Sequence, residues 1–218
     1  MNIYKKNLNQ LKQNFVYNET MEHDACGVGL VASTEGVKSR KVVEYGIQAL
    51  KAVWHRGAID ADGKTGDGAG IHIEIPKDFF IEKIEITGHR HDDSDLCVGM
   101  IFLPRNDYQG QEQCRIIVES ELTKKNFNIY GWRQVPVNPS VLGEKAENTR
   151  PEITQVLFKH NDKKVIGKNL ERVLYETRRK IEKEALNNQL NGFYICSFSS
   201  KSIIYLSLIH ISEPTRRT

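Results

Sequence analysis

The chain has 218 residues, of which 39% are hydrophobic and 27% are charged, and 31 Lys and Arg against 28 Asp and Glu give a net charge of +3. This composition is typical of a globular domain with a buried core and excludes disordered, collagen-like and coiled-coil proteins. The small excess of basic residues is interspersed with acidic ones, which argues against binding to nucleic acid or to a membrane surface through charge.

In the first half of the chain, hydrophobic patterning and turn residues predict each element. In order, the predicted elements are a polar leader (1–25), a buried strand (26–32), a turn rich in Ser, Thr and Gly (33–39), an amphipathic helix (42–54), a Gly- and Asp-rich loop (57–70) and a strand (71–75) that Pro76 ends.

In the second half, strands come in pairs between helices. The predicted elements are a strand (96–103), a helix (112–125), two extended segments (127–137 and 153–158), a helix (169–186) and two adjacent strands (193–198 and 202–205) that could form a hairpin. Mixed elements in this order predict a layered α/β or α+β domain.

The ends of the chain and its cysteines suggest a compartment. The N-terminal residues stay polar, unlike a signal peptide, and the longest nearly apolar run (203–211) is too short for a membrane helix of about 20 residues. No paired Cys-x-x-Cys spacing occurs, so we expect reduced thiols and a cytoplasmic location. A plastid location stays open as the alternative in a photosynthetic host.

Cys26 is the candidate nucleophile. Taken alone, it fits a buried cysteine in a strand. However, it lies where the polar leader meets the predicted strand, and Gly27 and Gly29 beside it would let a substrate or another backbone come close. If the bond between Ala25 and Cys26 is cut, the new α-amine has a pKa of about 8 and can serve as general base for the thiol. This junction therefore predicts an N-terminal nucleophile.

Two other polar clusters have weaker functional interpretations. The glycine-rich residues 65–70 lack the Gly-Lys-Ser/Thr and the following helix of a phosphate-binding loop, so a tight loop with positive-φ glycines is the better interpretation. His89 and His91 lie beside Asp92, Asp93 and Asp95, but in a polar loop without a second histidine pair or a cysteine. We therefore predict a solvated surface loop there and no metal site.

Seven segments carry a family resemblance when they are taken together. They are Asp-Ala-Cys-Gly-Val-Gly (24–29), His-Arg-Gly-Ala (55–58), Thr-Gly-Asp-Gly-Ala-Gly-Ile (65–71), Gly-Trp-Arg-Gln-Val-Pro-Val-Asn (131–138), Pro-Glu-Ile-Thr-Gln-Val (151–156), Leu-Tyr with Arg-Arg (174–175 and 178–179) and Phe-Tyr-Ile-Cys-Ser-Phe-Ser-Ser (193–200). In this order they resemble the N-terminal glutaminase domain of the glutamate synthase large-subunit family. That domain belongs to the class II glutamine amidotransferases, within the N-terminal nucleophile hydrolases.

The resemblance implies an α+β fold, a four-layer αββα sandwich that is incomplete here. It implies three regions: a propeptide (1–25) removed to expose Cys26, the N-terminal part of the amidotransferase domain (26–205), and a non-matching tail (206–218). It implies that Cys26 attacks the side-chain amide of L-glutamine to form a thioester, releasing ammonia and then glutamate. By analogy, Arg56 contacts the substrate, and the Gly66–Gly70 loop helps to shape the pocket. Asp60 stands where many relatives carry glycine.

For the full enzyme, the resemblance implies transfer of the ammonia to 2-oxoglutarate and reduction to glutamate. FMN, an iron–sulfur cluster and a nicotinamide or ferredoxin electron donor would serve that step, none of them within this chain. The implied partners are L-glutamine, 2-oxoglutarate, the synthase domains of the same chain and a small reductase subunit.

The chain also departs from the family. In the family, an Arg-Phe-Ser-Thr segment holds the glutamine carboxylate and an Asn-Gly pair supplies the oxyanion hole. Both come after the last matching strand, and neither follows that strand in this chain. We therefore expect the 218-residue chain to be inactive alone, since loss of one oxyanion donor costs about 10²–10³ in rate. Residues 206–218 resemble a translated sequencing adapter and are expected to be artefactual. Two alternatives stay open: another class II amidotransferase, and a non-catalytic module with the same fold.

Overall fold

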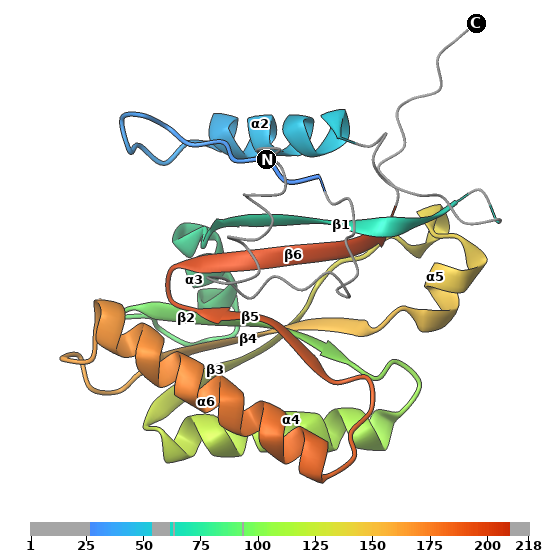
Figure 1. The fold of residues 1–218 in the computed structure, drawn as a ribbon. Helices are drawn as coiled ribbons and strands as arrows, with labels where there is room; N and C mark the ends of the chain where they lie inside the picture. Colours follow the sequence, from blue (N-terminus) through green and yellow to red (C-terminus); the bar gives the residue numbers. More distant parts are fainter. Residues whose placement is uncertain (1–26, 54–61, 63, 93, 210–218) are drawn as a thin grey trace, which may run out of the picture.

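The computed structural model describes residues 27–53, 62, 64–92 and 94–209, and these form a mixed α and β structure (Figure 1). Its elements are, in order, α2 (Arg40–Ala52), β1 (Thr65–Glu74), α3 (Lys77–Ile86), β2 (Leu96–Leu103), α4 (Tyr108–Lys124), β3 (Phe127–Gln134), the 3₁₀ turn η2 (Pro139–Val141), α5 (Glu144–Thr149), β4 (Glu152–His160), α6 (Gly167–Asn187), β5 (Tyr194–Ser199) and β6 (Ser202–Ile209).

A four-stranded antiparallel sheet in the order β3-β4-β2-β5 forms the centre. Its strand β2 has the bounds that its apolar run predicts. Successive β2 side chains point to opposite faces and are buried on both: Leu96 and Val98 lie in one apolar cluster, and Cys97 and Ile101 in the other. Burial on both faces explains why this strand reads as a continuous apolar run.

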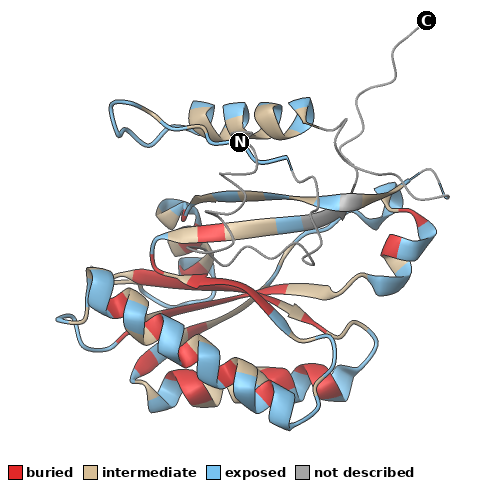
Figure 2. Cartoon of the chain, viewed as in Figure 1, coloured by how far each residue is buried: buried red, intermediate tan, exposed pale blue. Residues whose placement is uncertain are grey.

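Helices α4 and α6 cover one face of this sheet (Figure 1). Leu170, Leu174 and Ile181 of α6 recur at helical spacing and are buried against the sheet, as their pattern predicts. The two helices begin a few residues earlier than predicted, α4 at Tyr108 and α6 at Gly167. Figure 2 shows that buried residues concentrate in these helices and in the central sheet.

The other face of the central sheet carries a second sheet, the antiparallel pair β1 and β6. Strand β6 follows β5 directly but does not pair with it, so the predicted hairpin is wrong. Serine side chains explain the change of sheet, because the Ser199 hydroxyl accepts from the main-chain N–H of Lys201 (3.0 Å) and Ser202 (3.3 Å). The Ser197 hydroxyl likewise accepts from the N–H of Ile204 (3.1 Å). These main-chain N–H groups are thus bound to serine hydroxyls and not to a neighbouring strand. The chain then continues into the second sheet, where β6 pairs with β1.

Helix α2 lies on the outer side of β1 (Figure 1). It begins at Arg40, after an N-cap in which Ser39 accepts from the N–H of Lys41 (3.2 Å). The predicted amphipathic helix is confirmed, two residues earlier than expected at each end. None of its residues is fully buried, so its apolar stripe is only partly covered.

The predicted strand over residues 26–32 is wrong for the part that the structure describes. Residues 27–32 have no strand partner there, and Val28 and Leu30 are 90% and 92% exposed. A strand needs a neighbour for its backbone hydrogen bonds, and among the described strands none pairs with this segment. The apolar composition of the segment favours a strand, but it does not determine whether another strand lies beside it.

The predicted loop over residues 57–70 ends earlier than expected, because β1 already begins at Thr65. Helices α3 and α5 were not predicted at all. Pro76, interpreted as a strand end, is also the N-cap of α3. None of the helices among the described residues is long and apolar enough to span a bilayer.

Candidate functional site

Cys26 and Arg56, the two site residues predicted from the sequence, lie outside the residues that the structure describes. Their described neighbours are nevertheless informative. The chain after Cys26 runs beside α2, since a Cβ built on Gly29 would lie 3.9 Å from the Cβ of Ala49. The segment that contains Arg56 connects the end of α2 to the start of β1. Both predicted site residues therefore come from segments adjoining α2.

Asp62 follows the segment that contains Arg56 and forms a hydrogen-bonded turn with Lys64 and Thr65. Its carboxylate accepts from the N–H of Lys64 (2.9 Å) and from the N–H and hydroxyl of Thr65 (2.7 and 2.5 Å). These hydrogen bonds, that of the Thr65 hydroxyl foremost, lower the pKa of Asp62 to about 2. Asp62 and Thr65 also pack closely against Gly143, at which a Cβ would lie 2.7 Å from the Thr65 nitrogen. The turn thus locks the start of β1 against the segment that leads into α5.

The glycine-rich residues 65–70 belong to β1, and the close approach of β6 accounts for one of their glycines. A Cβ on Gly70 would lie 2.6 Å from Leu206 Cδ2 and 3.3 Å from the Tyr205 carbonyl oxygen. Gly68 has φ +94°, close to the irregular register between Thr65 and Ala69. Strand packing therefore explains two glycines of this motif without a ligand, and the motif's part in shaping a substrate pocket stays a prediction.

The three described cysteines are poor nucleophiles. Cys97, Cys114 and Cys196 are all buried and unpaired. Burial raises the pKa of Cys114 and of Cys196 to about 11, and that of Cys97 further still. Because the thiolate is the reactive form, these three thiols are almost entirely unreactive at neutral pH.

The His and Asp residues near position 90 are engaged with protein groups. His91 Nδ1 lies 2.9 Å from the Tyr130 hydroxyl, and Asp92 pairs with Lys159 (2.8 Å) and Lys163 (3.2 Å). Burial lowers the pKa of His91 and raises that of Tyr130 to about 12, so both groups are neutral at pH 7. Among the described residues, no three His, Cys, Asp or Glu side chains are grouped so that they could hold a metal ion.

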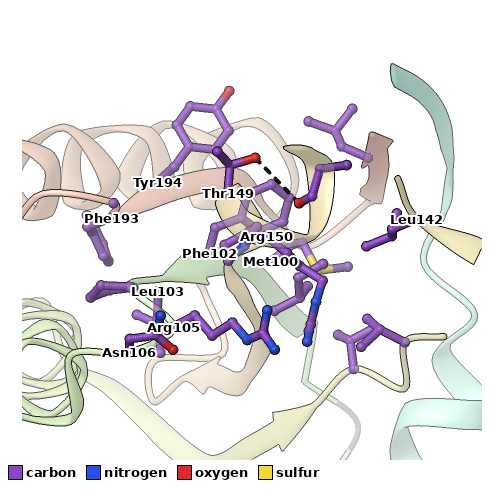
Figure 3. A pocket seen from close by; sticks show the side chains of 18 of the residues that line it. Met100, Phe102, Leu103, Arg105, Asn106, Leu142, Thr149, Arg150, Phe193 and Tyr194 are labelled. Carbon is purple, nitrogen blue, oxygen red and sulfur yellow. Dashed lines mark hydrogen bonds between the residues drawn. The ribbon is translucent and has the colours of Figure 1, made fainter. Parts of the chain in front are cut away.

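A cavity of about 760 Å³ lies between the two sheets, at the end of the molecule where α5 packs (Figure 3). Met100 and Phe102 of β2 and Tyr205 and Leu206 of β6 contribute to its walls, together with the connection from β3 to β4. Most of this lining is apolar, and it contains no cysteine, histidine or carboxylate. The cavity can hold an apolar group but supplies no nucleophile or general base of its own.

Two arginines at the cavity wall share one carboxylate. Arg105 Nη1 lies 2.6 Å from Glu147 Oε1, and Arg150 Nε lies 3.0 Å from Glu147 Oε2. The hydrogen bonds from Arg150 and Arg105 lower the pKa of Glu147, so two positive charges face one negative charge and the group carries a net charge of +1. No sequence pattern predicts this group, since Arg105 is far from the other two residues along the chain and neither of those stands out in the sequence. Only the acidic and basic ends of the short helix α5 could have drawn attention to it.

A partly buried chain of polar side chains crosses from the central sheet to β6 and reaches the same cavity. Arg133 donates to Gln155 Oε1 (2.8 Å), and Gln155 Nε2 donates to the Tyr205 hydroxyl (3.4 Å). Arg133 can face this layer because β3 has a bulge before Gly131, whose φ of +147° suits glycine. Two of the predicted family segments, around Gly131 and around Gln155, therefore meet in one structural feature.

The sequence profile of the family described as "Glutamine amidotransferases class-II" matches residues 26–214. The glutamate synthase (NADPH) large chain of Azospirillum brasilense is 53% identical over 199 residues, which are 91% of this chain and 13% of the relative. Ferredoxin-dependent glutamate synthase 2 of Synechocystis and ferredoxin-dependent glutamate synthase 1 of Arabidopsis thaliana are each 37% identical, over 86% of this chain and 12% of the relative. The chain thus spans about an eighth of the length of these curated relatives.

Proposed function

Because this chain belongs to the class II glutamine amidotransferases, we propose that it forms the N-terminal part of a glutamate synthase glutaminase domain, with Cys26 as its nucleophile. One observation carries the proposal: the family match begins at residue 26, the cysteine that the sequence analysis singled out. The three described cysteines support it further, since burial keeps each of them protonated.

In the proposed reaction, the Ala25–Cys26 bond is first cut, which frees the α-amine of Cys26. That amine takes the thiol proton as sulfur attacks the side-chain amide carbon of L-glutamine. The carbon–nitrogen bond then breaks, the leaving nitrogen takes up the proton and departs as ammonia, and a γ-glutamyl thioester remains. Water hydrolyses the thioester to glutamate and restores the thiol. Arg56 is proposed to contact the substrate.

The described structure is compatible with the αββα sandwich of N-terminal nucleophile hydrolases. Figure 1 shows α2, the β1–β6 pair, the central sheet and the α4–α6 pair one above another. We propose that these are four layers of that sandwich with some strands lacking. Residues 1–25 are then the propeptide and residues 26–205 part of the domain. The proposed artefactual tail, residues 206–218, is tested by resequencing the source locus past the codon for Tyr205. Strand β6 itself runs on to Ile209.

We propose that the glutamate synthase reaction on 2-oxoglutarate takes place in the additional length of the relatives. Among the described residues, Cys97, Cys114 and Cys196 are buried, and none of them is grouped with other side chains that could hold a metal ion. Flavin, cluster, electron donor and a small reductase subunit are proposed for the longer protein. A cytoplasmic location is proposed for it.

The test is labelling with an electrophilic analogue of glutamine, followed by peptide mapping. We expect one adduct per chain, on Cys26, that Cys26→Ser abolishes. An adduct on Cys97, Cys114 or Cys196 instead, or no adduct at Cys26, would contradict the proposal. Intact mass before labelling shows separately whether the chain begins at Cys26.

A further inference from the structure

The connection between α6 and β5 contains the pair Asn191-Gly192, and no other asparagine of the chain is followed by glycine (Figure 1). Helix α6 ends in a hydrogen-bonded turn, in which Gln189 has φ +55° and the N–H of Leu190 donates to the Ala185 carbonyl (3.0 Å). Strand β5 then begins two residues after Gly192. The pair therefore lies in the short turn between helix and strand, where both of its residues are exposed.

The fold itself favours glycine at position 192. Gly192 has φ +81°, in the left-handed region that residues with a side chain rarely adopt, and a Cβ there would lie 3.5 Å from the Cα of Pro104. Glycine has no Cβ next to its main-chain nitrogen. Consequently, no side chain on Gly192 hinders the approach of this nitrogen to the side chain of the residue before it.

Both groups of the pair are free of hydrogen bonds that would hold them in place. Among residues 27–53, 62, 64–92 and 94–209, no group is hydrogen-bonded to the Asn191 side-chain amide or to the Gly192 N–H. Rotation of the exposed Asn191 side chain toward the main chain therefore breaks no interaction within this part of the protein.

Two other asparagines in the described structure lack these features. The side-chain nitrogen of Asn188 donates to the Glu184 carbonyl (2.7 Å), and the residue that follows, Gln189, carries a side chain. Asn138 precedes Pro139, whose nitrogen has no hydrogen to lose. Both provide comparisons within the same molecule.

We propose that Asn191 is a site of spontaneous deamidation through a cyclic imide. The main-chain nitrogen of Gly192 loses its proton and attacks the side-chain carbonyl carbon, Cγ, of Asn191. The bond from Cγ to the side-chain nitrogen breaks, and this nitrogen takes up the proton and leaves as ammonia. Water then opens the imide. Cleavage between Cγ and the Gly192 nitrogen gives aspartate, and cleavage between the main-chain carbonyl carbon and the same nitrogen gives isoaspartate.

The products differ from Asn191 in charge and, for isoaspartate, in the path of the main chain. Each event replaces a neutral amide by a carboxylate and so lowers the net charge of +3 by one. In isoaspartate the main chain runs through Cβ and is one atom longer, between Leu190 and Phe193, which both pack against the apolar core. The proposal is independent of the glutaminase activity, because Cys26 takes no part in it.

The experiment incubates the folded 218-residue chain in mildly alkaline buffer and follows it by peptide mapping. Methylation by an isoaspartate methyltransferase counts isoaspartate, and ion exchange separates the more acidic product. We expect aspartate and isoaspartate to accumulate at position 191. Asn188 and Asn138, in the same digest, should react at least about tenfold more slowly.

Two glycine variants provide a matched comparison. Gly192→Ala should slow the reaction at Asn191 at least about tenfold, because the new Cβ hinders the attacking nitrogen. Gly88→Ala alters a glycine that is also exposed, follows a helix and has φ +82°, but comes after Thr87, and it should leave the rate at Asn191 unchanged. Circular dichroism melts verify that the variants fold. If Gly192→Ala does not, the comparison of Asn191 with Asn188 in the unaltered chain takes its place.

Four results would overturn the proposal. In the first, the product forms in urea but not in the folded chain, so that the turn keeps the reacting groups apart. In the second, aspartate forms without isoaspartate, which indicates direct hydrolysis of the side chain. In the third, Asn188 reacts as fast as Asn191. In the fourth, a folded Gly192→Ala variant reacts at the rate of the unaltered chain.

Discussion

The reactivity of the four thiols gives the sharpest prediction. Burial raises the pKa of Cys114 and Cys196 from 9.0 to about 11, so at pH 7 each has a thiolate fraction about 100-fold below that of an unperturbed thiol. Cys97 is perturbed more strongly in the same direction. If Cys26 is the nucleophile, its pKa is ordinary or lower. Iodoacetamide should therefore modify Cys26 at least about 100-fold faster than the other three.

The assay is a time course of alkylation in the folded protein, with the four cysteine peptides quantified by mass spectrometry. In urea the four rates should converge, because burial no longer acts on any thiol. The pH dependence adds a second criterion. The rate at Cys26 should level off above its own pKa, whereas the rates at Cys114 and Cys196 keep rising toward pH 11. Alkylation of any buried cysteine within about tenfold of Cys26 at pH 7 would refute the reasoning.

Three further predictions concern the fold. Phe158→Ala removes a fully buried ring that packs on Phe127 at a centroid distance of 5.3 Å. In urea titrations it should lower the free energy of unfolding by about 3–5 kcal/mol, and a loss below about 1 kcal/mol would contradict the packing. Glu171→Ala removes the acceptor of the Ser200 N–H (2.8 Å) and hydroxyl (2.7 Å) where the chain changes sheet, and should cost about 2–3 kcal/mol in the same measurement; an unchanged midpoint would contradict it. Because the pKa of Asp62 is lowered, its contribution to stability is present above about pH 4 and is lost as the pH falls toward 2. Asp62→Asn should remove this pH dependence of stability, and a titration of the Asp62 carboxyl near pH 3.8 by NMR would refute the prediction.

The sequence predicts a helix or strand well where the apolar spacing within that one segment matches the side chains that the fold buries. The bounds of β2 follow from its apolar run, and α6 follows from residues at helical spacing such as Leu170 and Leu174. Helix α5 was missed because it is short and carries a single buried residue, Ala146. For such an element, tertiary contacts outweigh local pattern.

Pairing between segments was less predictable, because hydrogen-bond partners depend on the whole fold. Strand propensity identified β5 and β6 but not that they lie in different sheets. The Ser197 and Ser199 hydroxyls that direct β6 away from β5 read as ordinary surface serines in the sequence. The Arg105–Glu147–Arg150 group was equally invisible, since 42 residues separate Arg105 from Glu147.

The distribution of burial connects the fold to the proposed chemistry. The central sheet with α4 and α6 holds most of the fully buried side chains, whereas α2 holds none (Figure 2). Cys26 and Arg56 belong to segments that adjoin α2, and Val28 and Leu30, which follow Cys26, are almost fully exposed. Regions with few buried apolar contacts open at the lowest free energy. The well-packed half can thus fold around its own core. The half proposed to carry the chemistry has few buried apolar contacts among the described residues.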